Sequence, residues 1–95
     1  MSRETLLALA DRVDAAKASD NALDVLGEVA LFKPSPKAVA IRPNAAGTKV
    51  IYTDSDGHET THWPWDWTHQ SLGMWHRRAH TAAALRARAK EAPSG

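Results

Sequence analysis

The 95-residue sequence predicts an α+β fold with the element order α-α-β-β-β-α, in which helices pack on a three-stranded antiparallel sheet and the last helix is the longest. Three observations predict this fold. Apolar residues recur every three or four positions in the first third of the chain, which is the period of a buried helical stripe. Apolar and polar residues alternate in the middle third, as they do in half-buried strands. A proline-free segment over residues 66–92 then returns to the helical period.

The length supports one hydrophobic core, so we expect a single domain over residues 1–92 and a short flexible tail over residues 93–95. Hydrophobic residues make up 43% of the chain and charged residues 24%, which is typical of a folded protein. The charged N-terminus lacks the apolar run of a signal peptide, and no other run could span a bilayer. Cysteine is absent. We therefore expect a cytoplasmic protein without a membrane segment.

Two helices are expected before residue 33. Ser2 is a suitable N-cap for the first helix, and Ser19 or Asp20 is suitable for the second. Pro34 and Pro36 lack the amide hydrogen that a continuing helix requires. Two short consecutive helices favour an antiparallel hairpin. The expected core positions are Leu6, Leu9, Ala10, Val13 and Ala16 in the first helix and Leu23, Leu26, Val29 or Ala30, and Phe32 in the second.

The middle third predicts a three-stranded meander. The segments that alternate, or that are rich in β-branched and aromatic residues, are AVAIR, TKVIYT and HETTHW. PNAAG is expected to link the first two strands. DSDG suits a turn between the second and third strands, with Gly57 at a positive φ angle.

The third helix is expected from about Asp66, a good N-cap, to Ala92, with Pro93 as the stop. On a helical wheel its apolar arc holds Trp67, Met74, Trp75, Ala79, Ala82, Leu85 and Ala89. Its opposite arc holds His69, His76, Arg77, His80 and Arg88. Gly73 is unfavourable inside a helix, so either the helix starts later, near Ser71, or a partner or second copy of the chain approaches that face closely.

All four tryptophans lie between positions 63 and 75, three of them in the segment HWPWDWTH. Pro64 ends the third strand and bends the chain. We expect Trp67 and Trp75 to fill the space between the sheet and the last helix, because each indole buries a large apolar area. Trp63 and Trp65 flank the bend, so at least one of them should stay partly exposed. An exposed tryptophan close to arginine has the composition of a binding hot spot.

These residues predict a non-enzymatic protein-binding module. The expected partner-binding residues are Trp63, Trp65, His69, His76, Arg77, His80 and Arg88. A partner protein is the expected ligand, and a second copy of the chain is a further candidate. We expect no enzymatic activity, because GxxxxGK[ST], GxGxxG and GxSxG are absent and no nucleophile lies beside a base.

Nucleic acid is the alternative partner. Residues 67–95 hold five basic side chains and one acidic side chain, and exposed indoles can stack on bases. Against this reading, cations are common near helix C-termini, and the pI of 8.2 is low for a dedicated nucleic-acid binder.

A histidine-based metal site is the second alternative. His76 and His80 have the i, i+4 spacing at which two imidazoles share an ion, whereas His58 and His62 would lie too far apart on a strand. HExxH is absent, and DSDG has no glutamate at the twelfth position of a calcium loop. We therefore expect no metal or other cofactor.

The stretches LLALADRVDAAKASDNALDVLGEVAL and AHTAAALRARAKEA resemble the two ends of a group of small phage and prophage accessory proteins. The resemblance covers under half of the chain, and the Trp- and His-rich middle departs from it, so no functional residue is transferred. It implies a sandwich of helices on a small sheet. It also implies a phage-encoded inhibitor that binds and blocks a host protein complex, as anti-CRISPR proteins do.

Overall fold

The computed structural model describes residues 1–69 and 77–92 and confirms the element order α-α-β-β-β-α. The elements are α1 (Arg3–Ala15), α2 (Asn21–Leu31), β1 (Ala40–Pro43), β2 (Val50–Thr53), β3 (Glu59–His62) and α3 (Arg77–Glu91). The last helix is described over 15 residues and α1 over 13, so the two helices are nearly equal in length.

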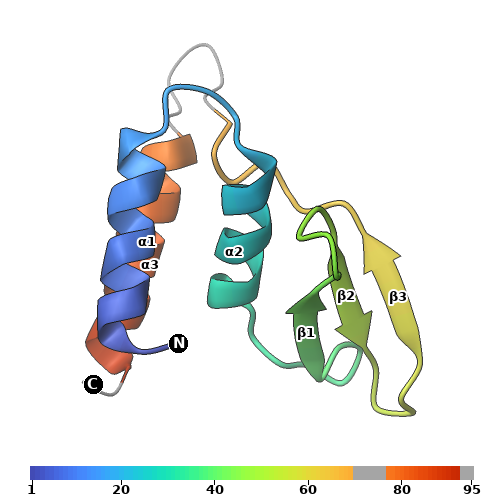
Figure 1. The fold of residues 1–95 in the computed structure, drawn as a ribbon. Coiled ribbons are helices and arrows are strands. Elements are labelled where there is room, and N and C mark those ends of the chain that lie inside the picture. Colours follow the sequence, from blue (N-terminus) through green and yellow to red (C-terminus); the bar gives the residue numbers. More distant parts are fainter. Residues whose placement is uncertain (70–76, 93–95) are drawn as a thin grey trace.

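The helices form two layers beside the sheet. Figure 1 shows α1 and α3 side by side and antiparallel, with α2 between this pair and the sheet. The predicted hairpin of the first two helices is therefore not the main helical contact, because α1 packs chiefly on α3. The helical core consists of Leu6, Leu9, Ala10, Val13, Leu23, Ala30, Ala82, Leu85 and Ala89.

Side-chain caps fix the starts of the first two helices. The Ser2 hydroxyl accepts from the Thr5 amide at 3.2 Å, and an Asp20 carboxylate oxygen accepts from the Leu23 amide at 3.1 Å. The predicted stripe of α1 is confirmed except for Ala16, which is half-buried. In α2, Leu23 and Ala30 are buried as predicted, whereas Leu26, Val29 and Phe32 are half-buried.

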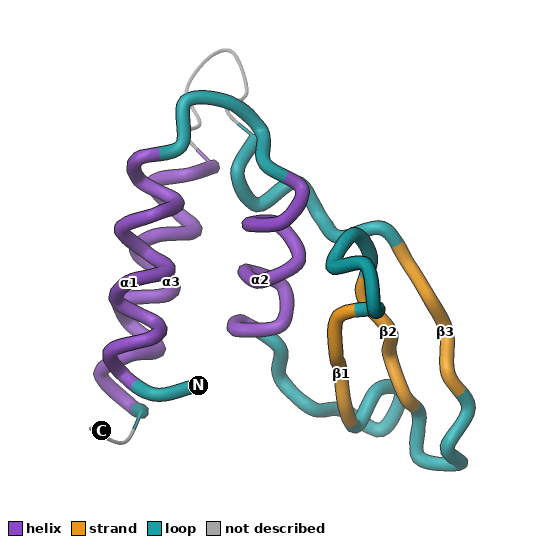
Figure 2. The backbone as a smooth tube through the Cα atoms, viewed as in Figure 1, coloured by secondary structure: helices purple, strands orange, loops and turns teal. Residues whose placement is uncertain are grey.

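The strands form the antiparallel meander β1-β2-β3 that the sequence predicts (Figure 2). Gly57 has a φ of 86° in the turn after β2, as expected. Val50 is fully buried, and Tyr52 reaches the α2 side chain Glu28, so these two residues define the inner face of the sheet. Residues at the alternate positions of each strand form the outer face.

The prediction that the last helix begins at Asp66 is wrong, because residues 63–69 are not helical. Side chains satisfy the backbone here instead of a helical ladder. The Trp67 carbonyl accepts from the Thr81 hydroxyl at 2.7 Å, and the Thr68 carbonyl accepts from Arg78 Nε at 2.6 Å. Of the predicted apolar arc, Ala82, Leu85 and Ala89 are buried, Trp67 is half-buried and Ala79 is exposed, while Met74 and Trp75 lie outside the described residues, as does Gly73.

Candidate partner-binding site

Residues 63–68, here called the tryptophan corner, connect the end of β3 to the segment before α3. The Trp63 and Trp65 residues are 66% and 69% exposed. Trp67 is half-buried. The expected exposure at the bend is confirmed, because Trp63 and Trp65 are both open to solvent, whereas Trp67 packs against α2 and not between the sheet and the last helix.

Glu28 on α2 holds the corner from beneath. Its Oε1 accepts from the Trp65 amide at 2.7 Å and from the Trp67 indole Nε1 at 3.2 Å, and its Oε2 accepts from the Tyr52 hydroxyl. The Glu28 side chain is buried, so these bonds compensate for its lost hydration. Burial, followed by the contact with Glu28, raises the pKa of Tyr52. One carboxylate thus joins the helix, the sheet and the corner.

Asp24 lies one turn earlier on α2 and holds the other end of the corner. Its Oδ1 accepts from the Thr68 amide at 2.7 Å and from the Thr68 hydroxyl at 2.8 Å, and both residues are buried. Burial raises the pKa of Asp24, and the two bonds from Thr68 partly oppose that rise. The spacing of four residues places both anchoring carboxylates on one face of the helix.

The Trp67 side chain lies over Gly27, between these two anchors. A Cβ atom at Gly27 would lie 3.5 Å from Trp67 Cβ and 3.6 Å from its Cγ, which is ordinary van der Waals contact. The space between the Trp67 side chain and the helix therefore has room for a methyl group, and the indole N–H donates to Glu28.

Trp63 extends the exposed aromatic surface onto the outer face of the sheet. Lys49 Nζ lies 4.5 Å from the centroid of the Trp63 ring, which is a cation–π contact. On the same face Arg42 forms an ion pair with Glu59, which lowers the pKa of that carboxyl. The outer face thus offers an indole with one basic group beside it and, further along the sheet, an arginine neutralised by a carboxylate.

The other predicted partner-binding residues are spread along the molecule. His69 is exposed, with its Nδ1 3.2 Å from the Ser19 hydroxyl, and His80 is exposed on the first turn of α3. Arg88 donates to the Phe32 carbonyl at 3.1 Å and lies at the opposite end of α3 from His80. His76 and the side chain of Arg77 lie outside the described residues. The alternative of a metal site at His76 and His80, which the sequence favours less than protein or nucleic-acid binding, is therefore not tested by the structure.

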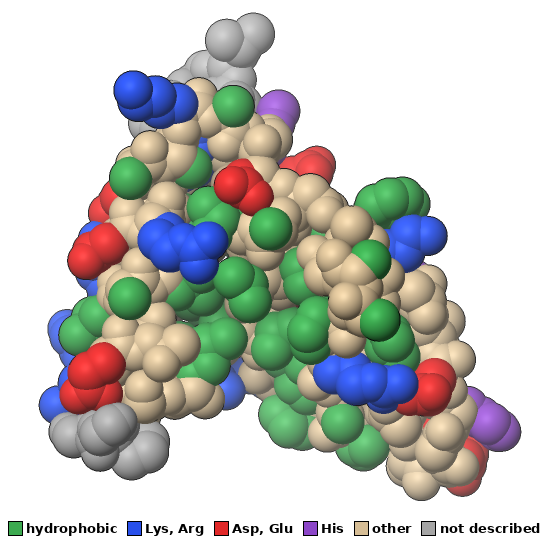
Figure 3. Space-filling model, in the orientation of Figure 1, with side chains coloured by type: hydrophobic (Ala, Val, Ile, Leu, Met, Phe, Trp, Pro, Cys, Tyr) green, Lys and Arg blue, Asp and Glu red, His purple; other side chains and the backbone are tan. Residues whose placement is uncertain are grey.

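Arg88 also lines a cleft between the helical layers. The cleft is lined by Met1, Leu6, Val29, Ala30, Arg88, Glu91 and Ala92. Figure 3 shows hydrophobic side chains gathered in the hollow between the helical pair and the sheet. The structure thus places Arg88 at this cleft and not on the outer face of the sheet.

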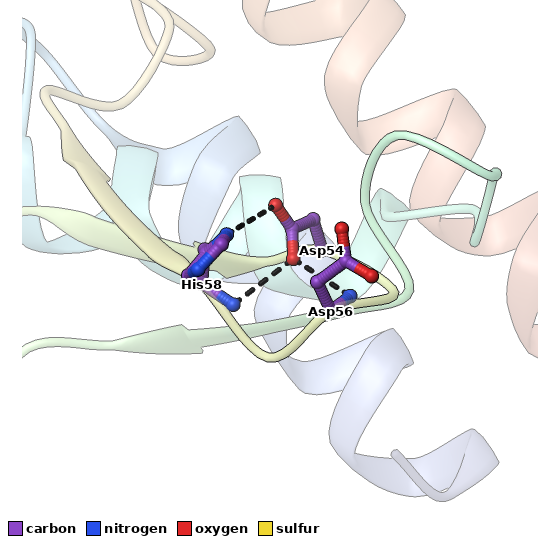
Figure 4. Close-up of side chains that lie close together, drawn as sticks. All are labelled: Asp54, Asp56 and His58. Carbon is purple, nitrogen blue, oxygen red and sulfur yellow. Dashed lines mark hydrogen bonds and ion pairs between the residues drawn. The ribbon is translucent and has the colours of Figure 1, made fainter.

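The DSDG turn brings Asp54, Asp56 and His58 together (Figure 4), with one ligand atom from each within 4.8 Å of the others. The Asp54 Oδ1 accepts from the amides of Asp56 and His58, each at 2.9 Å. These bonds shape the turn. The arrangement is the hairpin turn that the sequence predicts.

The sequence-based site omitted the residues that position it. Asp24, Gly27 and Glu28 form a D-x-x-G-E pattern in an otherwise apolar helix, and this pattern is the signal that could have marked them. Lys49 and Tyr52 carry no such signal, because their roles depend on the strand pairing of the folded sheet.

Comparisons with protein-family models, with curated proteins and with solved structures find no match to the chain. In the part of the chain that the structure describes, no helix combines the length and apolar character needed to cross a bilayer.

Proposed function

We propose that this chain is a non-enzymatic protein-binding module that engages a partner protein through Trp63 and Trp65. The supporting observation is that both residues are about two-thirds exposed, at 66% and 69%, although buried side chains of α2 bind the amides of Trp65 and Thr68 in the same corner. Large aromatic side chains supply most of the energy at many interfaces. A corner that is already ordered loses little conformational entropy when it binds.

The exposed rings are not needed to complete the core. Burying an indole removes roughly 200 Å² from water, so leaving two of them open forgoes stability that a small domain would otherwise gain. Trp67, two residues further on, shows that the same segment can bury a ring against α2. Partner binding accounts for the open positions of Trp63 and Trp65.

The resemblance of the two chain ends to phage accessory proteins supports a finer form of the proposal. In this form the partner belongs to a host protein complex, and binding at the tryptophan corner blocks it.

Nucleic acid is the weaker candidate because several cations of α3 are engaged within the chain. Arg78 donates to the Thr68 and Ala16 carbonyls. Arg86 pairs with Asp11 and Asp14. Such groups are less available to neutralise phosphates, which is the main source of affinity for nucleic acid.

Capture from bacterial lysate tests the proposal. The wild type, a Trp63→Ala/Trp65→Ala variant and a Leu7→Ala control are immobilised, and the captured proteins are identified by mass spectrometry. Leu7 is a suitable control because it is also an exposed large hydrophobic residue, at 40%, but lies on α1. We expect the wild type and the control to capture the same protein and the double variant to lose it.

Two results would contradict the proposal. Undiminished capture by a folded Trp63→Ala/Trp65→Ala variant would mean that the partner binds elsewhere. Capture that disappears after nuclease treatment, and that weakens steeply with salt, would favour nucleic acid.

A further inference from the structure

The free edge of β3 is the strongest feature that the proposed function does not use. β3 ends the strand order, and Figure 1 shows it at the margin of the molecule. The Asp54 amide donates to the His58 carbonyl at 3.0 Å, so these two residues form a hydrogen-bonded pair. This pair shows which residues of β3 bond to β2 and which do not. Because antiparallel partners alternate between bonded and non-bonded pairs, Thr60 and His62 bond to β2. The N–H and C=O groups of Glu59, Thr61 and Trp63 then point outward.

The other edge of the sheet is protected. The Asn44 amide donates to the Lys49 carbonyl at 3.0 Å, so the outward positions of β1 are Ile41 and Pro43. Pro43 has no N–H to donate, and proline at an edge prevents further pairing. In the part of the chain that is described, β3 itself has no proline and no lysine, and its register with β2 is uninterrupted; Pro64 follows only after the last outward position, Trp63.

The outward positions of β3 also carry the side chains of the outer face. Glu59 and Thr61 are exposed on this face, and Trp63 continues it beyond the strand. The neighbouring strand contributes Lys49 beside Trp63, and Arg42 on β1 pairs with Glu59. Any strand added at this edge therefore meets an acidic group at one end and an indole with a cation at the other.

We propose that a second copy of this chain pairs with β3 along this edge, antiparallel, about a twofold axis at Thr61. The twofold axis relates two identical antiparallel strands. Their outer faces lie on the same side of the joined sheet when each residue whose backbone points outward pairs with such a residue of the second copy. With the axis at Thr61, all three outward residues of each copy, Glu59, Thr61 and Trp63, pair with a residue of the other copy. This register places Thr61 opposite Thr61 and Glu59 opposite Trp63 of the second copy. The result is a continuous six-stranded sheet.

The side-chain pairs in this register are complementary, and this favours a second copy over an unrelated strand. Glu59 faces Trp63 of the second copy, whose ring carries the Lys49 ammonium group, so opposite charges lie on either side of one indole. Threonine opposite threonine is a favourable pair, and no like charges lie directly opposite each other in the paired segment.

The dimer goes beyond the proposed function, and it leaves the outer face of the sheet, with Trp63, accessible to a partner protein. Strand addition occupies the backbone edge, while both Trp63 rings remain on one side of the joined sheet. Their positions differ by four residues along the strands, or about 13 Å. The dimer would thus present two tryptophan corners on one surface.

A charge-swap experiment tests this register, since each residue at the axis faces its own copy. Thr61→Lys and Thr61→Glu are prepared separately, and their masses are measured by sedimentation equilibrium over a range of concentrations. We expect the wild type to dimerise and each variant to have a dissociation constant about five-fold higher, because like charges then lie opposite each other. An equimolar mixture should form a heterodimer, with wild-type affinity or better.

The matched controls are Ala84→Lys and Ala84→Glu, which introduce the same charges at an exposed position of α3. These controls should dimerise as the wild type does, alone and mixed. Circular dichroism of the Thr61 variants should match the wild type, because the Thr61 amide points away from the β2–β3 ladder.

A wild type that remains monomeric at millimolar concentration would overturn the proposal, as would a dimer unaffected by the Thr61 charges. A monomeric wild type whose partner capture is lost in Thr61→Lys would assign the edge to a strand of the partner protein instead. Failure of partner capture in the lysate experiment leaves the dimer measurement unaffected, so the two proposals can fail separately.

Discussion

At the scale of single residues, Glu28 accepts three hydrogen bonds that connect the tryptophan corner, α2 and the sheet. It accepts from the Trp65 amide, the Trp67 indole and the Tyr52 hydroxyl, which belong to segments far apart in the sequence. A buried carboxylate is favourable only where donors surround it. Removing it would leave those partly buried donors without their acceptor.

We therefore expect Glu28→Ala to lower the free energy of unfolding by about 3 kcal/mol, since each unpaired donor costs roughly 1–3 kcal/mol. Glu28→Gln keeps one acceptor oxygen and should cost less. Urea denaturation followed by circular dichroism measures both effects. Asp66→Ala, which removes an exposed carboxylate of the same corner, is the control. Equal stability of Glu28→Ala and the control would show that the anchor is unimportant.

Asp24 gives the stability a defined dependence on pH. Burial raises its pKa in the folded protein above the ordinary value of 3.8, so the folded state binds this proton more tightly than the unfolded state does. Asp24 therefore contributes fully to the free energy of unfolding below pH 3.8, where its carboxyl is protonated in both states. This contribution is lost as the pH rises through the raised pKa of the folded protein. Asp24→Asn removes the titration and retains an oxygen that can accept from Thr68.

We expect the free energy of unfolding of the wild type, minus that of Asp24→Asn, to fall as the pH rises above 3.8 and then to level off. Denaturation curves at half-unit pH intervals measure this difference. A difference that increases with pH over the same range would mean that the hydrogen bonds from Thr68 outweigh the burial of the carboxylate.

At the scale of elements, α2 acts as the support for the corner. It contributes Asp24 and Glu28, one helical turn apart, and the Trp67 side chain lies over Gly27 between them. The helix thus has two buried faces: one packs in the helical core, and the other contacts the tryptophan corner.

Substitution of Gly27 tests that contact. The space above Gly27 accommodates a methyl group at 3.5 Å from Trp67 Cβ. Because alanine is about 1 kcal/mol more favourable than glycine inside a helix, Gly27→Ala should be neutral or stabilising by up to that amount. Gly27→Leu should displace the indole and destabilise the fold by about 2 kcal/mol. Thermal unfolding of the two variants checks the order, and equal stabilities would place Trp67 away from the helix.

Element order could be predicted from the sequence because it depends on local features. Ser2 and Asp20 cap their helices, and Gly57 makes its turn, through interactions within four residues. The sequence left the start of the last helix ambiguous, because Asp66 is a good N-cap by composition whereas Gly73 favours a later start. Contacts with α2 decided the conformation of Thr68 instead. The exposure of Trp63 and Trp65 was predictable from Pro64, whereas their buried anchors were not.

At the scale of the whole molecule, polar bridges join the helical layers to the corner. Arg78 donates to the Ala16 carbonyl after α1 and to the Thr68 carbonyl in the corner, at 2.8 and 2.6 Å. Thr81 adds a bond to the Trp67 carbonyl. The sheet is therefore connected to the α1–α3 pair through α2 and through the corner, and hydrogen bonds from both helical layers hold the segment that carries the exposed indoles.

The proposal that Trp63 and Trp65 contact the partner can be tested most directly by ¹⁹F NMR of 5-fluorotryptophan-labelled protein bound to the captured partner. Tryptophan-to-phenylalanine variants assign the resonances, and the solvent isotope shift between H₂O and D₂O reports the exposure of each ring. We expect Trp63 and Trp65 to show large shifts in the free protein that decrease in the complex, with Trp67 unchanged. Large shifts that persist at both positions in the complex would show that the partner binds another surface.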